Sequence, residues 1–193
     1  MSTLIQDPNY PEQVLNKASN IKLLICDVDG VLSNGQVIIG NNSEELKTFN
    51  IKDGFGIKCL QKSGIAVAII TGRNSKIVEK RCQELGIEHY YQGQSNKQEA
   101  FDTLCKDLSV QPEQICHIGD DLPDLPLLVQ VGLGVTVADG HWLMQQHADW
   151  ITQNNGGFGA VREVCDLILH SQNKLEAIHQ DYLTKAQPSG VKQ

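Results

Sequence analysis

Asp27 and Asp29, two aspartates separated by a single valine, are the residues of this sequence that point most directly to chemistry. They follow residues 21–26, an apolar segment with the length of a buried central strand. Residues i and i+2 of an extended chain lie on the same side, so both carboxylates can face one site. If they do, the crowded carboxylate pair needs a proton or a cation between its members, which indicates a functional site. The alternative interpretation is that these are ordinary turn or N-cap aspartates. Other motifs in the chain must separate these two interpretations.

Two later apolar segments also end in polar residues, namely Thr71 after one and Asp120 with Asp121 after the other. The carboxyl ends of parallel strands lie along one edge of a sheet, so these side chains are expected to meet the first aspartate pair. Either Asp121 or Asp124 could instead cap the helix that follows. Carboxylates from two strand ends, without matching histidines or cysteines, are the hard oxygen ligands that suit Mg²⁺.

Lys97 occupies an unusual place in the pattern. Ser95 and Gln98 form the capping-box sequence Ser-x-x-Gln, which predicts that Lys97 lies in the first turn of a helix. A lysine there opposes the helix dipole, whose N-terminal end is already positive. Lys97 is therefore either a solvated surface lysine or part of an anion site that uses both the lysine and the helix end.

Together these side chains are the parts that phosphoryl transfer requires. Asp27, at the strand end, can attack phosphorus and form an aspartyl phosphate. Asp29, on the loop side, can protonate the leaving alkoxide and then activate water. Thr71 can donate a hydrogen bond to a phosphate oxygen, while Lys97 and a magnesium ion neutralise the charge on the transferring oxygens.

The elements that must position these residues alternate between strands and helices along the chain. Such alternation predicts an α/β fold: a three-layer Rossmann-like sheet, mostly parallel, with helices on both faces. The expected strands are residues 21–26, 65–70, 88–92, 115–118, 133–137 and 150–151. The expected helices are residues 10–18, 53–63, 75–85, 96–108 and 125–129, a short one near 142, and a last one at 160–169.

One insertion interrupts this alternation. Residues 36–39 and 44–49 have the pattern of two strands around a Gly/Asn turn, which predicts a β-hairpin insertion at about 36–49. Residues 1–185 are expected to form a single domain, followed by a disordered tail at 186–193. The chain leaves no room for a separate cap domain.

The composition restricts the classes of partner and compartment. The 16 lysines and arginines stand against 23 aspartates and glutamates, and the net charge of −7 argues against nucleic acid or an anionic membrane as a partner. No apolar run approaches the roughly 18 residues of a membrane span, and residues 1–20 lack the pattern of a signal peptide. None of the six cysteines forms a Cys-x-x-Cys pair, so we expect reduced core thiols in a cytoplasmic protein.

Four motifs, in this order, resemble those of the haloacid dehalogenase-like phosphohydrolases. They are Asp-x-Asp-Gly at 27–30, Thr-Gly-Arg at 71–73, the following Lys97, and Gly-Asp-Asp-x-x-Asp at 119–124. The finer pattern is closest to the 3-deoxy-D-manno-octulosonate 8-phosphate phosphatase family. The segments that carry this finer resemblance are 26–35 (CDVDGVLSNG), 49–60 (FNIKDGFGIKCL), 69–73 (IITGR), 91–97 (YQGQSNK), 118–124 (IGDDLPD) and 156–164 (GGFGAVREV).

The resemblance implies an activity and a set of roles. The family hydrolyses 3-deoxy-D-manno-octulosonate 8-phosphate to the free sugar acid and phosphate for lipopolysaccharide assembly. It implies Asp27 as the nucleophile and Asp29 as the general acid/base. The implied Mg²⁺ ligands are the Asp27 carboxylate, the Asp29 backbone carbonyl and the Asp120 carboxylate, supported by Asp121 and Asp124. The implied phosphoryl- and substrate-binding residues are Asp29, Asn50, Ile51, Lys52, Asp53, Gly54, Lys58, Thr71, Arg73, Arg81 and Lys97.

The resemblance also implies self-association, because members of the family look like homotetramers whose hairpins meet in a central barrel. The residues give an independent reason to expect this. A site of this type must be covered, and a hairpin of about 14 residues cannot close a cleft alone. Neighbouring subunits are therefore expected to supply the lid.

Two departures from the family pattern and several alternatives bear on the substrate. The family often has arginine where this chain has Phe158 and Lys52. A lysine keeps the charge but loses the planar fork that binds a carboxylate. The alternative substrate is another acidic sugar phosphate, of the nine-carbon sialic type, and a phosphomutase is the alternative activity.

Two further protein classes use similar residues but fit the sequence less well. A signalling receiver domain would have its acidic pair before the phosphorylated aspartate, whereas here Asp120 and Asp121 come last. A catalytically silent relative would have lost Asp27 or Asp29.

Overall fold

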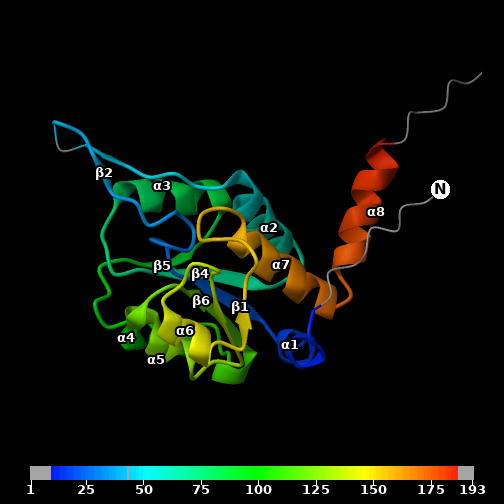
Figure 1. The fold of residues 1–193 in the computed structure, drawn as a ribbon. Helices are drawn as coiled ribbons and strands as arrows, with labels where there is room; N and C mark the ends of the chain where they lie inside the picture. The colour runs from blue at the N-terminus through cyan, green and yellow to red at the C-terminus, as the bar shows by residue number, and fades with distance from the viewer. Residues whose placement is uncertain (1–9, 43, 187–193) are drawn as a thin grey trace, which may run out of the picture.

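The computed structural model describes residues 10–42 and 44–186, and its framework is a six-stranded sheet (Figure 1). Neighbouring strands all pair in parallel, in the order β5-β4-β1-β6-β7-β8. The strands are β1 (Leu23–Cys26), β4 (Ala66–Ile70), β5 (His89–Tyr91), β6 (Ile115–Gly119), β7 (Leu133–Thr136) and β8 (Trp150–Ile151). The predicted α/β fold is confirmed.

Helices cover both faces of the sheet, as Figure 1 shows, with α2, α3 and α7 on one face and α4, α5 and α6 on the other. The helices are α1 (Glu12–Ala18), α2 (Ile51–Lys62), α3 (Lys76–Leu85), α4 (Gln98–Asp107), α5 (Leu125–Leu128), α6 (Trp142–His147), α7 (Ala160–Ser171) and α8 (Leu175–Ala186). Short 3₁₀ turns lie at Pro112–Gln114 and Leu122–Asp124.

The alternation of side chains along β1 divides the apolar interior into two cores. Leu23 and Ile25 pack with Phe101 of α4 in one core, whereas Leu24 and Cys26 belong to the other, with residues of α2, α3 and α7. All four residues of β1 are fully buried. A strand covered on both faces has no polar side, which is why its sequence is a continuous apolar run.

The strand order reverses at β1. The chain runs outward from β1 to β4 and β5, and then returns to the other side of β1 at β6. In α/β sheets the crevice at such a reversal, beyond the carboxyl ends of the strands, is where ligands bind. The fold therefore places the loops after β1, β4 and β6 together.

The predicted hairpin insertion is present between β1 and α2, but its strands are short. β2 (Ile38–Ile39) pairs antiparallel with β3 (Glu45–Leu46), and this ribbon makes a sheet of its own. In Figure 1 it projects from the body of the molecule. Among the described residues, nothing else is inserted between β1 and α2, so this part of the chain contains no separate cap domain.

The prediction that the helix at 160–169 is the last one is wrong, because α8 follows it. Leu175 is the only buried residue of α8, so the helix lacks the apolar periodicity that would have revealed it. Ala186, expected to begin a disordered tail, is the final residue of α8. The rest of the predicted tail, 187–193, lies outside the described residues.

Two predicted helix starts also need correction. The Ser95–Gln98 capping box does not form: Lys97 directly precedes α4, and the backbone N–H of Gln98 donates to Asn96 Oδ1 at 3.1 Å. α2 begins at Ile51, two residues earlier than expected, because the Asn50 side chain caps it and accepts the Lys52 N–H at 2.9 Å.

Two predictions from composition can also be compared with the structure. None of the helices within residues 10–42 and 44–186 is both long enough and apolar enough to cross a membrane. All six cysteines carry free thiols, and five of them are buried, which confirms the prediction of reduced core residues.

Candidate active site

Residues from the carboxyl ends of β1, β4 and β6 converge on one cavity of about 190 Å³. These strands are adjacent at the centre of the sheet, so motifs far apart in the sequence become neighbours. The cavity is lined by Asp27, Asp29, Thr71, Gly72, Arg73, Lys97, Asp120, Asp121, Pro123 and Asp124. The structure thus brings together all the polar residues that the strand-end argument singled out.

Lys97 lies at the centre of the buried part of this cluster. Its Nζ donates to Asp27 Oδ1 and to Asp124 Oδ1, each at 2.6 Å, and all three side chains are almost fully buried. Asp124 Oδ1 also lies 3.0 Å from His117 Nε2, on β6. The surface-lysine interpretation of Lys97 is therefore wrong. A buried ammonium of this kind is retained only when anions surround it.

Burial and neighbouring charges set the charge states of these groups. Burial raises the pKa of Asp27, and the charge of Asp124 adds to this rise although Lys97 opposes it. Burial and the charges of Asp27 and Asp124 raise the pKa of Asp120 to about 7. Burial would also raise the pKa of Asp124, but His117 and Lys97 outweigh it, so that pKa is lowered. For Lys97, the attraction of Asp27 and Asp124 outweighs burial and raises the pKa, which keeps it an ammonium.

Asp29 lies nearer the surface and contacts the hairpin. Its Oδ1 pairs with Lys47 Nζ and accepts a hydrogen bond from Ser33 Oγ at 3.3 Å. Its Oδ2 lies 3.7 Å from Arg73 Nε. Arg73 in turn donates to Glu45 Oε1 of β3 at 3.1 Å. The insertion therefore reaches the cavity through charged side chains of the same chain.

Glycines allow the loops around the cavity to approach one another closely. Gly30 has a φ of +101°, and a Cβ built on it would lie 2.0 Å from Asp120 Oδ2. A Cβ on Gly156 would lie 1.6 Å from the backbone oxygen of Gly30, and Gly157 donates its N–H to the carbonyl of Val31 at 2.8 Å. The loop before α7 thus supports the loop that carries the two aspartates.

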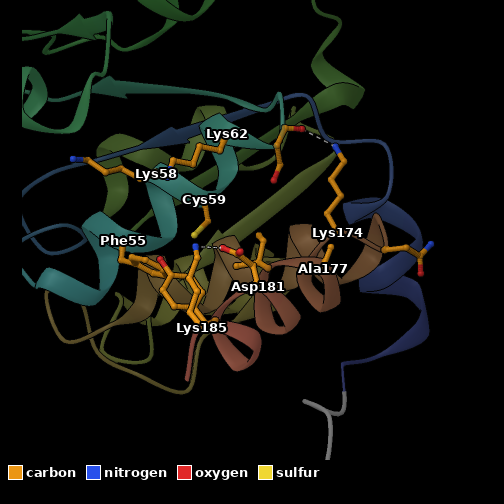
Figure 2. A pocket seen from close by; sticks show the side chains of 12 residues that line it. Phe55, Lys58, Cys59, Lys62, Lys174, Ala177, Asp181 and Lys185 are labelled. Carbon is orange, nitrogen blue, oxygen red and sulfur yellow. Dashed lines mark hydrogen bonds and ion pairs between the residues drawn. The ribbon is translucent and has the colours of Figure 1, made fainter. Parts of the chain in front are cut away.

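A larger cavity of about 560 Å³ lies elsewhere, between α2 and α8 (Figure 2). Two of its lysines are engaged: Lys174 donates to the Ser63 backbone carbonyl at 2.9 Å, and Lys185 pairs with Asp181 at 2.5 Å. None of the strand-end residues lines this cavity. Its volume alone therefore gives no reason to place the chemistry there.

Comparison with known proteins agrees with this geometry. The model of the haloacid dehalogenase-like hydrolase family matches residues 90–164. The 3-deoxy-D-manno-octulosonate 8-phosphate phosphatase of Salmonella typhi is 58% identical over 163 residues, which are 84% of this chain and 87% of that protein. The chain belongs to the 3-deoxy-D-manno-octulosonate 8-phosphate phosphatase family.

Solved structures of this family share the fold over most of the chain. The crystal structure of the Yersinia pestis phosphatase is 57% identical, has a TM-score of 0.85, and is matched over 86% of this chain and 89% of that one. The Moraxella catarrhalis phosphatase, in complex with a magnesium ion, a phosphate ion and a KDO molecule, is 44% identical with a TM-score of 0.88, over 90% and 99% of the two chains.

The acidic residues of this family member fit a magnesium ion. One carboxylate oxygen from each of Asp27, Asp120 and Asp124 can be chosen so that all three lie within 4.8 Å of one another. All are hard oxygen donors, which Mg²⁺ prefers. Burial raises the pKa of Asp120, and the neighbouring carboxylates Asp27 and Asp124 raise it further; a bound divalent cation would offset both effects.

Several residues that the resemblance implied for substrate binding are not brought to this cavity within one chain. Lys58 lines the α2–α8 cavity instead, and Ile51 is 84% exposed. Asp53 is buried and accepts the backbone N–H of Arg162 at 2.8 Å, so it caps the start of α7. The residues of this set that do not line the cavity are Asn50, Ile51, Lys52, Asp53, Gly54, Lys58 and Arg81.

Sequence reasoning missed three residues that contact the cluster, namely His117, Lys47 and Ser33. His117 had a signal: it is the one histidine in the apolar run of β6 and is fully buried. Lys47 and Ser33 had none, because only the folded hairpin and the turn after β1 bring them to Asp29.

Proposed function

We propose that this chain is a Mg²⁺-dependent phosphatase that hydrolyses 3-deoxy-D-manno-octulosonate 8-phosphate to the free sugar acid and phosphate, for lipopolysaccharide assembly. The observation that carries the proposal is the convergence of Asp27, Asp29, Thr71 and Lys97 at the ends of adjacent strands. This convergence occurs in a chain 58% identical to a phosphatase of that name.

Asp27 is the proposed nucleophile. Its carboxylate attacks phosphorus, the bond from phosphorus to the sugar oxygen breaks, and an aspartyl phosphate forms. Lys97, 2.6 Å from Asp27 Oδ1, holds the attacking group in place and faces the position of the transferring oxygens. Thr71, at the end of β4, is the proposed hydroxyl donor to the phosphoryl group.

Asp29 is the proposed general acid/base. It gives a proton to the sugar oxygen as that oxygen leaves, and it then takes a proton from the water that attacks the aspartyl phosphate. Its position two residues beyond the nucleophile, on the solvent side of Asp27, supports this division of roles.

The Asp27 and Asp120 carboxylates and the Asp29 backbone carbonyl would hold the magnesium ion, with Asp121 and Asp124 in support. When bound, the ion supplies positive charge that screens the nucleophile from the phosphoryl oxygens. Asp124 suits a supporting role because Lys97 and His117 already engage its Oδ1. Asp121 caps the following turn through the Leu122 N–H at 2.8 Å.

We propose a homotetramer in which neighbouring subunits complete each site. The hairpin supports this, because a two-stranded ribbon is marginal alone and Ile39 and Leu46 on it are 70% and 57% exposed. Six free thiols support a reducing compartment, so the proposed location is the cytoplasm.

A phosphate-release screen over sugar phosphates tests the proposal. Octulosonate 8-phosphate is expected to have the highest kcat/KM, and chelation of divalent metal is expected to stop the reaction reversibly. Nine-carbon acidic sugar phosphates are the necessary comparison, because Phe158 and Lys52 replace arginines that the family often has. A preference for a nine-carbon substrate would overturn the substrate but not the chemistry.

A further inference from the structure

Lys47 is a buried cation on an otherwise exposed ribbon. It follows β3 directly, and its side chain is 0% exposed, although the neighbouring Leu46 is 57% exposed. Lysines are almost never buried without a partner, because desolvation of the ammonium is costly. The partner of Lys47 is Asp29, the proposed acid/base.

The contacts of Asp29 differ between its two oxygens. Oδ1 takes both hydrogen bonds, from Lys47 and from Ser33 Oγ. Oδ2 is buried and accepts no hydrogen bond from any residue within 10–42 and 44–186; Arg73 Nε lies 3.7 Å from it. One oxygen is thus held and the other is left without a donor.

A second pair of contacts holds Lys47 itself. Glu45 Oε1 lies 3.5 Å from Lys47 Nζ and accepts from Arg73 at 3.1 Å. Two cations and two carboxylates therefore form one network between the hairpin, the loop after β1 and the loop after β4. A network of this kind fixes geometry better than one exposed ion pair does.

We propose that Lys47 is a positioning residue for the general acid: it holds the Asp29 carboxyl through Oδ1 and so fixes where that group meets the leaving oxygen of the substrate. This inference rests on the proposed phosphatase function and adds to it a residue of the hairpin. As the Asp27 oxygen bonds to phosphorus, the bond from phosphorus to the sugar oxygen breaks, and its electron pair stays on the sugar oxygen. That oxygen takes a proton from the Asp29 carboxyl.

The proposal predicts a dependence on the leaving group. A sugar alkoxide is a poor leaving group and needs the proton, whereas p-nitrophenolate leaves without it. Misplacement of a general acid by about 1 Å can lower the rate about 10²-fold. We therefore expect Lys47→Met to lower kcat on octulosonate 8-phosphate roughly 10- to 100-fold and to change KM by less than about threefold. On p-nitrophenyl phosphate, kcat is expected to fall by less than about threefold.

The experiment measures both substrates with Mg²⁺-saturated full-length enzyme. Lys106→Met is the matched control, since Lys106 is an exposed lysine in the last turn of α4 and does not line the cavity; its rates are expected to equal those of the wild type. Ser33→Ala removes the other donor to Asp29 Oδ1 and is expected to give a smaller loss with the same dependence on the leaving group. If Lys47→Met does not fold, Lys47→Gln is measured in its place, with the same losses expected.

Equal losses on both substrates, or no loss on the sugar phosphate, would overturn the role of Lys47. Such a result leaves the proposed function in place, because the wild-type rates are measured in the same experiment. If the wild-type enzyme releases no phosphate from either substrate, the proposed function fails, and the role of Lys47 fails with it.

Discussion

Lys97 connects the proposed nucleophile, Asp27, to the supporting carboxylate of Asp124. With Asp27 and Asp124 each 2.6 Å away, its charge balances groups that burial would otherwise protonate. The same charge faces the transferring phosphoryl group in the proposed mechanism. One buried lysine thus serves both the resting protein and the transition state.

Replacing Lys97 by alanine is expected to lower kcat about 10²- to 10³-fold, by analogy with removal of one oxyanion donor. It is also expected to destabilise the fold by about 3–5 kcal/mol, because a buried partner charge is left uncompensated. Phosphate release and thermal unfolding measure the two effects separately. An active Lys97→Ala enzyme would remove Lys97 from the mechanism.

The raised pKa of Asp120 predicts how pH affects the metal-free enzyme. A folded-state pKa of about 7, against 3.8 in the unfolded chain, means that the folded protein binds this proton more tightly. This contribution to stability is complete below about pH 4 and is lost as the pH rises through about 7.

We therefore expect the unfolding free energy of chelator-treated wild type to fall, relative to Asp120→Asn, by roughly 2–3 kcal/mol between pH 5 and pH 8. In thermal melts, the Tm of the wild type relative to Asp120→Asn is expected to fall by roughly 5–10 °C over the same pH range. Saturating Mg²⁺ should reduce the difference, since the cation replaces the proton. Parallel profiles of unfolding free energy against pH for the two proteins would contradict the raised pKa of Asp120.

At the scale of elements, the loop before α7 supports the loop after β1. Gly156 lies against the Gly30 carbonyl, and Gly157 bonds to Val31, so the position of the two aspartates depends on a segment more than 120 residues away. This explains why the 156–164 segment belongs to the family pattern although none of its residues lines the cavity.

Gly156→Ala is expected to lower kcat by about tenfold or more and the unfolding free energy by about 1–3 kcal/mol, because its Cβ would lie 1.6 Å from the Gly30 oxygen. Gly64→Ala is the control. Gly64 has a φ of +80° but open space around it, so only backbone strain of about 1 kcal/mol is expected, with unchanged kcat. Equal kcat values for the two variants would show that the loop contact does not matter to the site.

The elements could be predicted from the sequence to different degrees, for physical reasons. β1, β4 and β6 are apolar runs buried on both faces, so their ends, and the polar residues there, could be located. α8 buries one residue and left no periodic signal. The helix start at Lys97 was misjudged because tertiary contacts to Asp27 and Asp124 override the local capping pattern. The contact between Lys47 and Asp29 had no local signal at all.

At the scale of the whole molecule, the hairpin is a surface that a single chain leaves unpaired. Its strands have two residues each, and their apolar side chains face outward. Exposed apolar ribbons of this kind are usually protected by pairing or by burial against a partner. The proposed tetramer would supply that partner.

Ile39→Asp is expected to dissociate the assembly and to lower the activity about tenfold or more, because a charge is placed in the proposed interface. Sedimentation velocity and phosphate release would be measured on the same sample. Val129→Asp, at a side chain that is 59% exposed at the end of α5, is the control and is expected to change neither. A monomer with full activity would contradict the proposal that neighbouring subunits complete the site.

The central claim is that Asp27 attacks phosphorus, and the turnover of Asp27→Asn tests it most directly. The variant keeps the shape of the side chain but removes the nucleophile. Phosphate release from octulosonate 8-phosphate, with Mg²⁺ present, is expected to fall by about 10⁴-fold or more, while the circular dichroism spectrum is unchanged. Activity within about tenfold of the wild type would contradict the claim and remove Asp27 as the nucleophile.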